Sequence, residues 1–211
     1  MNPPAIAIDG PAASGKSTVA KLIARELGYT FINTGAMYRA VTWYALQKGI
    51  DPADTAAVTA LLGDIPLSFG KDGAVSTVMC EGRVLSTELT STEVNDNVSA
   101  IAAIPEVRAL LVEKQREYNR KEPVVMEGRD IGTVVFPQTP FKYFVTASEE
   151  VRAARRAAQG LTDSIAERDR KDSARACAPL VMADDATLVD TSDLTIEQVV
   201  ARVVADKKSK I

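Results

Sequence analysis

The amino-acid sequence predicts an α/β fold in which a mostly parallel sheet is covered by helices on both faces, a three-layer α/β/α arrangement. Two observations support this prediction. Short apolar runs alternate with segments of helical periodicity along most of the chain, and the first apolar run leads through a glycine-rich loop into a helix. A third observation adds a small antiparallel sheet, because residues 65–89 contain short apolar runs separated by glycine-containing turns.

The composition fits one compact unit and narrows the possible functions. The chain has 211 residues, of which 46% are hydrophobic, so it can build a sizeable core. Its formal net charge is -3, and we therefore expect no long nucleic acid as a partner. The absence of histidine excludes Ser-His, Cys-His and His-metal mechanisms. Phosphoryl transfer between two phosphates remains open, since it requires positioning and charge neutralisation rather than a strong base.

Cysteine usage and hydropathy indicate the compartment. Cys80 and Cys177 lie far apart and suggest neither a disulfide framework nor a metal site. No apolar run is long enough to span a membrane, and the N-terminus lacks a signal-peptide pattern. We therefore expect a cytoplasmic protein with no membrane partner. The sequence leaves its oligomeric state open, and a monomer is compatible with it.

The first βα unit carries the most informative motif. Residues Ala5–Asp9 are expected to form a buried strand, and the apolar residues after Ser17 recur at helical spacing until Gly28 can end the helix. The loop between them fits the phosphate-binding pattern G-x-x-x-x-G-K-[ST]. It reads Gly10, Pro11, Ala12, Ala13, Ser14, Gly15, Lys16 and Ser17. The backbone N–H groups of such a loop and the N-terminus of its helix bind phosphate, and the hydroxyl of the last residue can reach Mg²⁺.

The next elements complete the first half of the chain. Residues 31–32 are expected to form a short strand, and residues 36–48 a helix that Gly49 ends. Asp51 or Asp54 can start another helix, which should end near Gly63. Three short strands are then expected at residues 65–69, 74–80 and 84–89, and these make up the inserted antiparallel sheet.

The second half returns to alternating helices and strands. Helices are expected at residues 91–103 and 105–119, with Pro105 at the first position of the second one. Buried strands are expected at residues 124–126, 143–145 and 188–189. A helix should begin after Ser148, and the last helix should begin near Thr195, where Thr195 and Gln198 can form a capping box.

Three charged clusters stand where such a sheet binds ligands. Arg39 belongs to a cluster at residues 34–39 after the second strand, and residues 127–130 follow another buried strand directly. Because the carboxyl ends of parallel strands meet at one edge of a sheet, both clusters are expected in one cleft. In the third cluster Arg168, Asp172 and Arg175 share one face of an expected helix. Each cluster taken alone also fits a solvated surface.

Taken together, the motifs resemble those of the bacterial-type cytidylate kinases, a family of P-loop nucleoside monophosphate kinases. The matching segments are residues 9–17, 34–39, 127–133 and 168–180, and they run through nearly the whole chain. The segment from Gly128 to Thr133 and the antiparallel insertion are the most specific parts. The resemblance implies one domain with a core at about 1–36, 120–155 and 176–211, an acceptor-binding lobe at about 37–119 and a short lid at about 156–175.

The resemblance also implies substrates and residue roles. ATP would be the phosphate donor, Mg²⁺ the metal, and CMP and dCMP the acceptors. Lys16, Arg129, Arg155 and Arg156 would be catalytic. The loop from Gly10 through Ser17, with Thr18 and Arg152, would bind ATP, and Ser17 would also contact the metal. The acceptor would be bound by Thr34, Tyr38, Arg39, Ser99, Arg108, Arg129, Asp130, Arg168, Asp172 and Arg175.

The base assignments also agree with the chemistry of cytosine. Asp130 can accept a hydrogen bond from the amino group at N4, and Arg108 can donate to N3 or O2. Uracil carries an oxygen at position 4, which would face the carboxylate acceptor to acceptor. We therefore expect CMP to be preferred over UMP. The lid segment, residues 157–167, is shorter than in many members of this family, which leaves open how well the closed site excludes water.

The sequence leaves two alternatives open. The chain could phosphorylate another nucleoside monophosphate such as UMP, or another small anionic metabolite. It could also be a nucleotide-gated switch, although no switch segment is evident and the arginine clusters favour a second anionic ligand.

Overall fold

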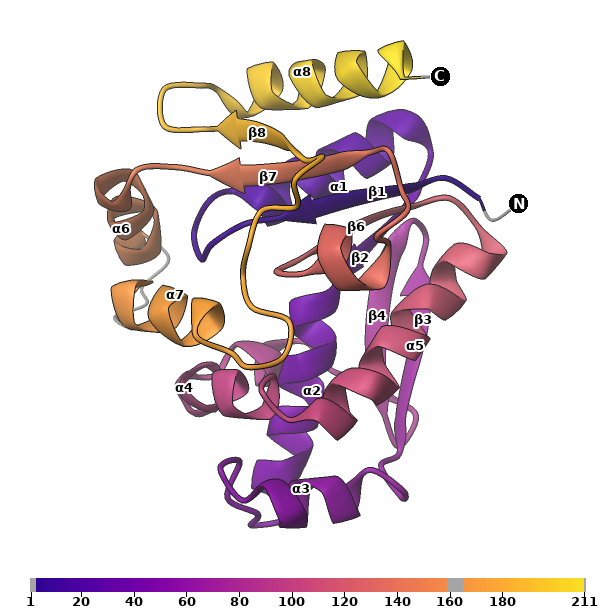
Figure 1. The fold of residues 1–211 in the computed structure, drawn as a ribbon. Helices are drawn as coiled ribbons and strands as arrows, with labels where there is room; N and C mark the ends of the chain where they lie inside the picture. Colours follow the sequence, from indigo (N-terminus) through magenta and orange to yellow (C-terminus); the bar gives the residue numbers. More distant parts are fainter. Residues whose placement is uncertain (1–2, 159–164, 211) are drawn as a thin grey trace.

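The computed structural model describes residues 3–158 and 165–210, with the side chains of residues 165, 167 and 168 left out. Its strands form one sheet in the order β3-β4-β2-β6-β1-β7-β8, and β5 pairs with β4 (Figure 1). The strands are β1 Ala5–Asp9, β2 Thr30–Asn33, β3 Leu67–Asp72, β4 Val75–Cys80, β5 Arg83–Val84, β6 Val124–Gly128, β7 Lys142–Thr146 and β8 Thr187–Asp190.

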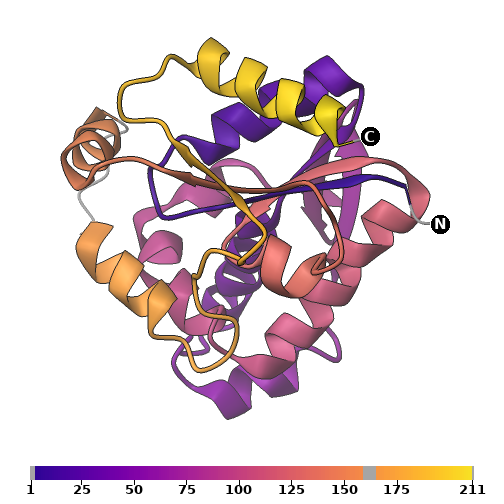
Figure 2. The same ribbon diagram turned by 45° about the horizontal axis from the view of Figure 1, so that its top comes forward.

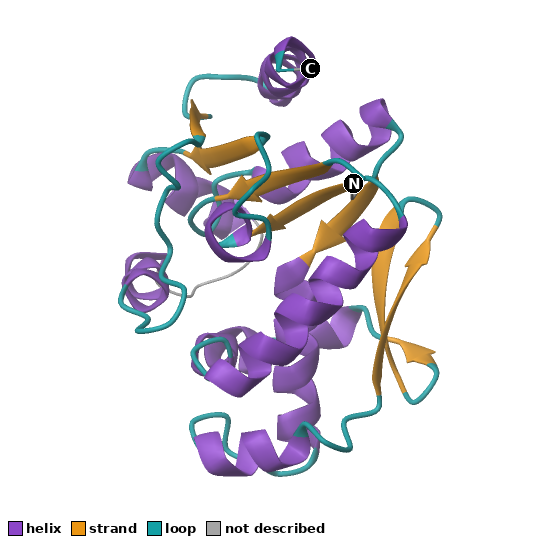
Figure 3. Cartoon of the chain, turned by 45° about the vertical axis from the view of Figure 1, so that its right-hand side comes forward, coloured by secondary structure: helices purple, strands orange, loops and turns teal. Residues whose placement is uncertain are grey.

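The centre of the sheet is parallel, as the sequence predicts. β1 pairs in parallel with β6 and β7, β2 pairs in parallel with β6, and β8 pairs in parallel with β7. The antiparallel β3–β4 hairpin continues the sheet, because β4 also pairs with β2 through Phe31 and Val75 (Figure 3). The predicted α/β class with an antiparallel addition is therefore confirmed.

Helices cover the two faces of the sheet, and alternate side chains of β1 show the layering. Ile6 and Ile8 belong to a core cluster with α1 (Lys16–Leu27) and α8 (Ile196–Ser209), which lie side by side (Figure 2). Ala5 and Ala7 belong to a cluster that includes Val112 of α5 (Pro105–Lys121) on the opposite face. Successive residues of a strand point to opposite faces, so a continuous apolar run fits a sheet that is buried on both.

A separate apolar core lies beneath the hairpin. It joins β3 and β4 to α2 (Thr34–Gln47), α3 (Thr55–Leu61) and α4 (Thr92–Ile101). α2 begins two residues before its predicted start, because the Asn33 side chain accepts the N–H of Ala36 and caps the helix. Of the two predicted caps for α3, Asp54 is the one used, since it accepts the N–H of Ala57.

One predicted strand is wrong. Residues 84–89 do not form a strand, because β5 ends at Val84 and a 3-10 helix follows at Thr87–Thr90. Side chains in this segment bond to nearby backbone groups, with Glu88 accepting the N–H of Ser86 and Thr90 donating to the carbonyl of Thr87. Such local bonds compete with the ladder of a strand.

Two arginine-rich helices lie at the carboxyl end of the parallel strands. α6 (Glu149–Ala158) and α7 (Ile165–Ser173) stand beside each other in Figures 1 and 2. α7 ends at Ser173, so the prediction that Arg175 lies on the same helix as Asp172 is wrong. The chain folds back there, since the carbonyl of Asp172 accepts the N–H of Leu180.

The predicted capping box of Thr195 and Gln198 at α8 is confirmed. Among the described residues, no helix is both long and apolar enough to cross a membrane.

Candidate active site

The phosphate-loop sequence adopts a left-handed backbone at three positions. Gly10 has φ 152°, Ala13 φ 58° and Gly15 φ 87°. Gly10 also lies close to β7, because a Cβ at this position would overlap the carbonyl oxygen of Val145. Only glycine combines this conformation with this approach. The loop is thereby held against the carboxyl end of the sheet.

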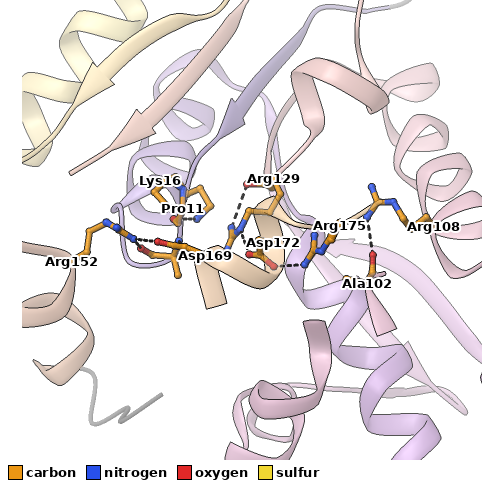
Figure 4. Close-up of polar contacts among 11 residues, drawn as sticks. Pro11, Lys16, Ala102, Arg108, Arg129, Arg152, Asp169, Asp172 and Arg175 are labelled. Atoms are coloured by element: carbon orange, nitrogen blue, oxygen red, sulfur yellow. Dashed lines mark hydrogen bonds and ion pairs between the residues drawn. The ribbon is translucent and has the colours of Figure 1, made fainter. Parts of the chain in front are cut away.

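Lys16 is the first residue of α1 and points back over the loop. It is only 6% exposed, and its Nζ donates a hydrogen bond to the carbonyl of Pro11 at 2.8 Å (Figure 4). Gly15 precedes it as the N-cap, and no described side chain caps the helix. A helix N-terminus of this kind, next to a buried ammonium group, suits an anion such as a phosphate.

Ser17 and Glu127 place oxygen atoms next to the loop. The Ser17 hydroxyl donates to Glu127 Oε1 at 2.7 Å, and Glu127 is buried near the end of β6. The hydroxyl of Thr34 donates to the backbone carbonyl of Glu127 at 2.8 Å, which joins α2 to the same strand end. Hydroxyl and carboxylate oxygens are ligands that Mg²⁺ accepts.

A buried ion pair lies across the site from Lys16. Arg108 of α5 pairs with Asp130, and its guanidinium also donates to the carbonyl of Ala102 at 3.1 Å. The guanidinium lies 5.7 Å from the ring centre of Tyr38. Burial raises the pKa of the Asp130 carboxyl, and the neighbouring guanidinium of Arg108 opposes that shift. Burial likewise raises the pKa of Tyr38 to about 12, so its hydroxyl stays neutral.

Asp172 forms ion pairs with two further arginines. Arg129 donates to it from Nε at 2.8 Å, and Arg175 pairs with its other oxygen (Figure 4). Asp172 is only 2% exposed, so its charge is balanced by these two guanidinium groups in a buried setting. The segment after β6 and the end of α7 are brought together in this way, although they are 43 residues apart in sequence.

Helices α6 and α7 also contact the phosphate loop. Asp169 of α7 pairs with Arg152 of α6 and accepts the N–H of Ala12 at 3.2 Å. Arg152 in turn donates to the carbonyl of Ala12 at 3.3 Å. Both backbone polar groups of Ala12 are therefore bonded to side chains of these two helices.

Arg155 is fixed against the end of β8. It donates to the hydroxyl of Thr191 at 3.0 Å, to the backbone carbonyl of Thr191 at 2.9 Å and to that of Ser14 at 3.3 Å. Thr191 is buried, and its hydroxyl also donates to Ser14 at 3.1 Å. These hydrogen bonds thus hold the Arg155 guanidinium against the end of β8 and the phosphate loop.

One cavity of about 610 Å³ joins these groups. Most residues predicted for the site line it: Ala12, Ala13, Ser14, Gly15, Lys16, Ser17, Thr18, Thr34, Tyr38, Arg39, Ser99, Arg108, Arg129, Asp130, Arg155, Arg156, Asp172 and Arg175. Three others are described but are not among the lining residues: Gly10, Pro11 and Arg152. The side chain of Arg168 lies outside the described residues.

Four residues that contact this site received no role from the sequence. They are Asp9, Glu127, Asp169 and Thr191. Asp9 ends β1, Glu127 is the last residue but one of β6, and Thr191 follows β8. All three lie at the carboxyl edge of the parallel strands, and that position is the signal that could have identified them. Asp169 gives no such signal, because its partners are brought to it only by the tertiary fold.

Comparisons with known proteins agree with this geometry. The family model described as cytidylate kinase matches residues 6–209. A cytidylate kinase of Lactiplantibacillus plantarum is 44% identical, with 97% of this chain and 96% of that protein covered. A cytidylate kinase of Streptococcus pneumoniae strain 70585 is 46% identical, with 98% of each covered.

Solved structures share the fold at much lower identity. A gluconokinase from Sinorhizobium meliloti 1021 is 18% identical with a TM-score of 0.51, over 99% of this chain and 93% of that one. A sugar kinase from Janibacter sp. HTCC2649 is 14% identical with a TM-score of 0.50, over 96% of this chain and 93% of the other. These similarities concern the arrangement of helices and strands alone.

Proposed function

The chain belongs to the cytidylate kinase family, and on that premise we propose that it transfers the γ-phosphoryl group of ATP to CMP, and also to dCMP. The products are ADP and the corresponding diphosphate. The observation that supports this most directly is that one cavity has the phosphate loop on one side and the buried Arg108–Asp130 pair on the other. Such a cavity can hold a donor and an acceptor nucleotide with their phosphates facing each other.

The donor phosphates bind at the loop and the start of α1. Lys16 exchanges its bond to the Pro11 carbonyl for phosphate oxygens, which are stronger acceptors because they are charged. Arg155 already lies against the loop through Ser14 and can approach the transferring group with little reorganisation. Arg156 lines the same cavity and adds charge there, while Arg152 acts from behind the loop through Ala12.

The acceptor phosphate binds to Arg39 and Arg129. Both line the cavity between the loop and the base site. Arg129 is paired with Asp172 in this structure, and a phosphate of higher charge competes with that carboxylate for the guanidinium. Thr34, Tyr38, Ser99, Asp172 and Arg175 also line the cavity, and in this proposal they contact the base and ribose of the acceptor.

Mg²⁺ fits the oxygens of Ser17 and Glu127, which would hold it together with phosphate oxygens of the donor. Within the described part of the chain, no group of three or more acidic, cysteine or histidine side chains could hold a metal by itself. An ion shared between protein and nucleotide agrees with that donor set. It would supply charge neutralisation on the donor phosphates.

The reaction needs no strong base on the protein. The attacking oxygen belongs to a phosphate that is already ionised near neutral pH, so the side chains act by orientation and by neutralising charge. Lys16, Arg129 and Arg155 surround the region where two anions must approach each other. They lower the repulsion that otherwise prevents attack.

The base is selected by the Arg108–Asp130 pair. Asp130 accepts the N4 amino hydrogen of cytosine, and Arg108 donates to N3 or O2. With UMP the carboxylate faces a carbonyl oxygen, and a buried group loses its partner. We therefore expect a higher kcat/KM with CMP and dCMP than with UMP.

A coupled ADP-release assay with CMP, dCMP, UMP and AMP tests this proposal. Lys16→Ala should lower kcat/KM at least about 100-fold with every acceptor, because it removes the charge at the transferring group. Asp130→Asn should lower kcat/KM mainly with CMP and dCMP. Lys21→Ala is the matched control, since Lys21 is exposed on the same helix as Lys16. Equal efficiency of the wild-type enzyme with UMP and CMP would refute the base-reading role of Asp130 and Arg108.

A further inference from the structure

Asp9 is a buried carboxylate at the carboxyl end of β1, and the proposed mechanism gives it no part. The residue is only 6% exposed. Its Oδ1 accepts the backbone N–H of Ile131 at 2.8 Å, and its Oδ2 accepts that of Gly132 at 2.7 Å. A carboxylate that binds two successive backbone N–H groups fixes the conformation of the segment that carries them.

The segment fixed in this way directly follows the two acceptor-site residues Arg129 and Asp130. β1 and β6 are neighbours in the sheet, with Asp9 opposite Gly128, so the carboxylate reaches from one strand to the chain that leaves the next. The fit is close on both sides. A Cβ on Gly132 would lie 3.3 Å from Asp9 Oδ2 and 3.2 Å from Cδ of Lys142.

We propose that Asp9 is a positioning residue for the acceptor nucleotide. It holds the main chain that directs Arg129 toward the acceptor phosphate and Asp130 toward the base. Among the described residues, Asp9 is not one of those that line the cavity, so it acts through these two side chains and does not touch the substrate. The inference rests on the proposed function, because it uses the acceptor roles given there to Arg129 and Asp130.

A role in shaping the phosphate loop is the competing explanation, because Gly10 follows Asp9 directly. The side-chain contacts favour the acceptor side. Both hydrogen bonds of the carboxylate lead to residues 131 and 132, whereas Gly10 is fixed by its close approach to Val145. Asp9 immediately precedes the phosphate loop in the chain and bonds to the segment after Asp130, so it connects the two parts of the site. The two explanations differ in the substrate whose binding depends on Asp9.

Two variants separate these explanations. Asp9→Asn keeps the size of the side chain but turns an amide N–H₂ toward one of the two backbone N–H groups, which is left without an acceptor. Gly132→Ala disturbs the same contact from the other side and keeps the carboxylate. In both variants we expect KM for CMP to rise, by about tenfold or more in Asp9→Asn, as the loss of a buried hydrogen bond that leaves a donor unsatisfied implies. The Kd for ATP, measured by calorimetry without CMP, should change less than about twofold.

Thr191→Val is the matched control. Thr191 is buried at the end of β8, as Asp9 is at the end of β1, but its hydroxyl contacts the donor-side groups of Ser14 and Arg155. This variant should therefore weaken ATP binding and leave KM for CMP nearly unchanged. A CMP-selective defect in Thr191→Val as well would show that any loosening of the sheet edge has this effect, and it would overturn the proposal.

Circular dichroism and thermal unfolding identify the variants that fold. If Asp9→Asn does not fold, Gly132→Ala provides the same test. Equal weakening of ATP and CMP binding in a folded variant contradicts the proposal, and so does an unchanged KM for CMP. A wild-type protein that binds ATP but does not phosphorylate CMP would refute the proposed function instead.

Discussion

At the scale of single residues, Gly10 and Gly28 share a positive φ but differ in their surroundings. Gly28 has φ 68° at the end of α1, and nothing lies within 4 Å of an added Cβ. Gly10 has φ 152°, and its Cβ would overlap the carbonyl oxygen of Val145. Alanine at Gly28 tests conformational strain alone, whereas alanine at Gly10 combines strain with a steric conflict at the phosphate loop.

Alanine at these two positions should therefore have different effects. Gly28→Ala should lower the free energy of unfolding by about 1 kcal/mol, the usual cost of a left-handed residue with a Cβ. Gly10→Ala should lower it by about 3 kcal/mol or more, because overlap with a backbone carbonyl adds to the strain. Urea denaturation measures both values, and calorimetry should show weaker ATP binding in Gly10→Ala only. Similar values for the two variants would mean that the loop can move away from β7 at little cost.

Single residues also show which contacts cannot be predicted from the local sequence. Gly10 through Ser17 could be assigned to a phosphate loop from their spacing, because the pattern and its flanking strand and helix are continuous in the chain. The contacts of Asp169 with Ala12 join residues 157 positions apart, and no local pattern contains them. The same is true of Arg129 and Asp172, whose pairing could not be derived from either cluster alone.

At the scale of elements, α7 links the phosphate loop to the proposed acceptor side of the site. Asp169 and Asp172 are three residues apart and so lie on neighbouring positions of one face. The first is bonded to Ala12 and Arg152, and the second to Arg129 and Arg175. A displacement of this short helix would therefore change the surroundings of both proposed nucleotide subsites at once.

Asp169→Asn tests the donor end of this link. Asn keeps an acceptor for the Ala12 N–H but removes a negative charge beside the phosphate loop and releases Arg152 from its ion pair. Because ATP brings further negative charge to the loop, we expect its Kd to fall by about threefold to tenfold, the size typical of a partly exposed charge interaction. Fluorescence titration with a labelled ATP analogue, without CMP, measures the change.

The control is Asp184→Asn, which removes the same charge from an exposed position outside the cavity lining. It should leave the Kd for ATP unchanged. Weaker ATP binding in Asp169→Asn would contradict the expected repulsion and would show that the carboxylate supports the loop instead.

The elements differ in how well their own residues determine them. α3 and α8 begin at side-chain caps, Asp54 and Thr195, that lie within three residues of the groups they bind, so their starts could be predicted. The π-helical turn Ile131–Val135 is different. Two of its backbone N–H groups bond to Asp9, more than 120 residues earlier in the chain, and only the assembled sheet supplies that acceptor.

At the scale of the whole molecule, the position of the site follows from the topology of the sheet. β1, β2 and β6 run parallel, so the segments that follow them meet at one edge. This is why members of three clusters that are separate in the sequence, at residues 10–17, 34–39 and 127–130, line one cavity. Which side chains pair with one another within that cavity could not be predicted from the strand topology. Arg108 and Asp172 reach it from helices whose packing depends on the tertiary fold.

The two halves of the cavity should stabilise the whole molecule independently when they are occupied. A ligand that binds only the folded state adds about 2.7 kcal/mol at 100 times its Kd. For a chain of this size that corresponds to a rise in Tm of about 5 to 10 °C. ADP and CMP are suitable ligands, since no transfer occurs between them. Each should raise the Tm of the wild-type protein, and UMP at the same concentration should raise it less than CMP.

Variants then show whether each half acts as the geometry implies. Lys16→Ala should lose the shift caused by ADP and keep the shift caused by CMP, because Lys16 lies at the donor loop. Asp130→Asn should lose the shift caused by CMP and keep the one caused by ADP, because its partner is Arg108 across the cavity. Differential scanning fluorimetry measures all four combinations. Loss of both shifts in one folded variant would mean that the two nucleotides share a single subsite, and the end-to-end arrangement of donor and acceptor would then be wrong.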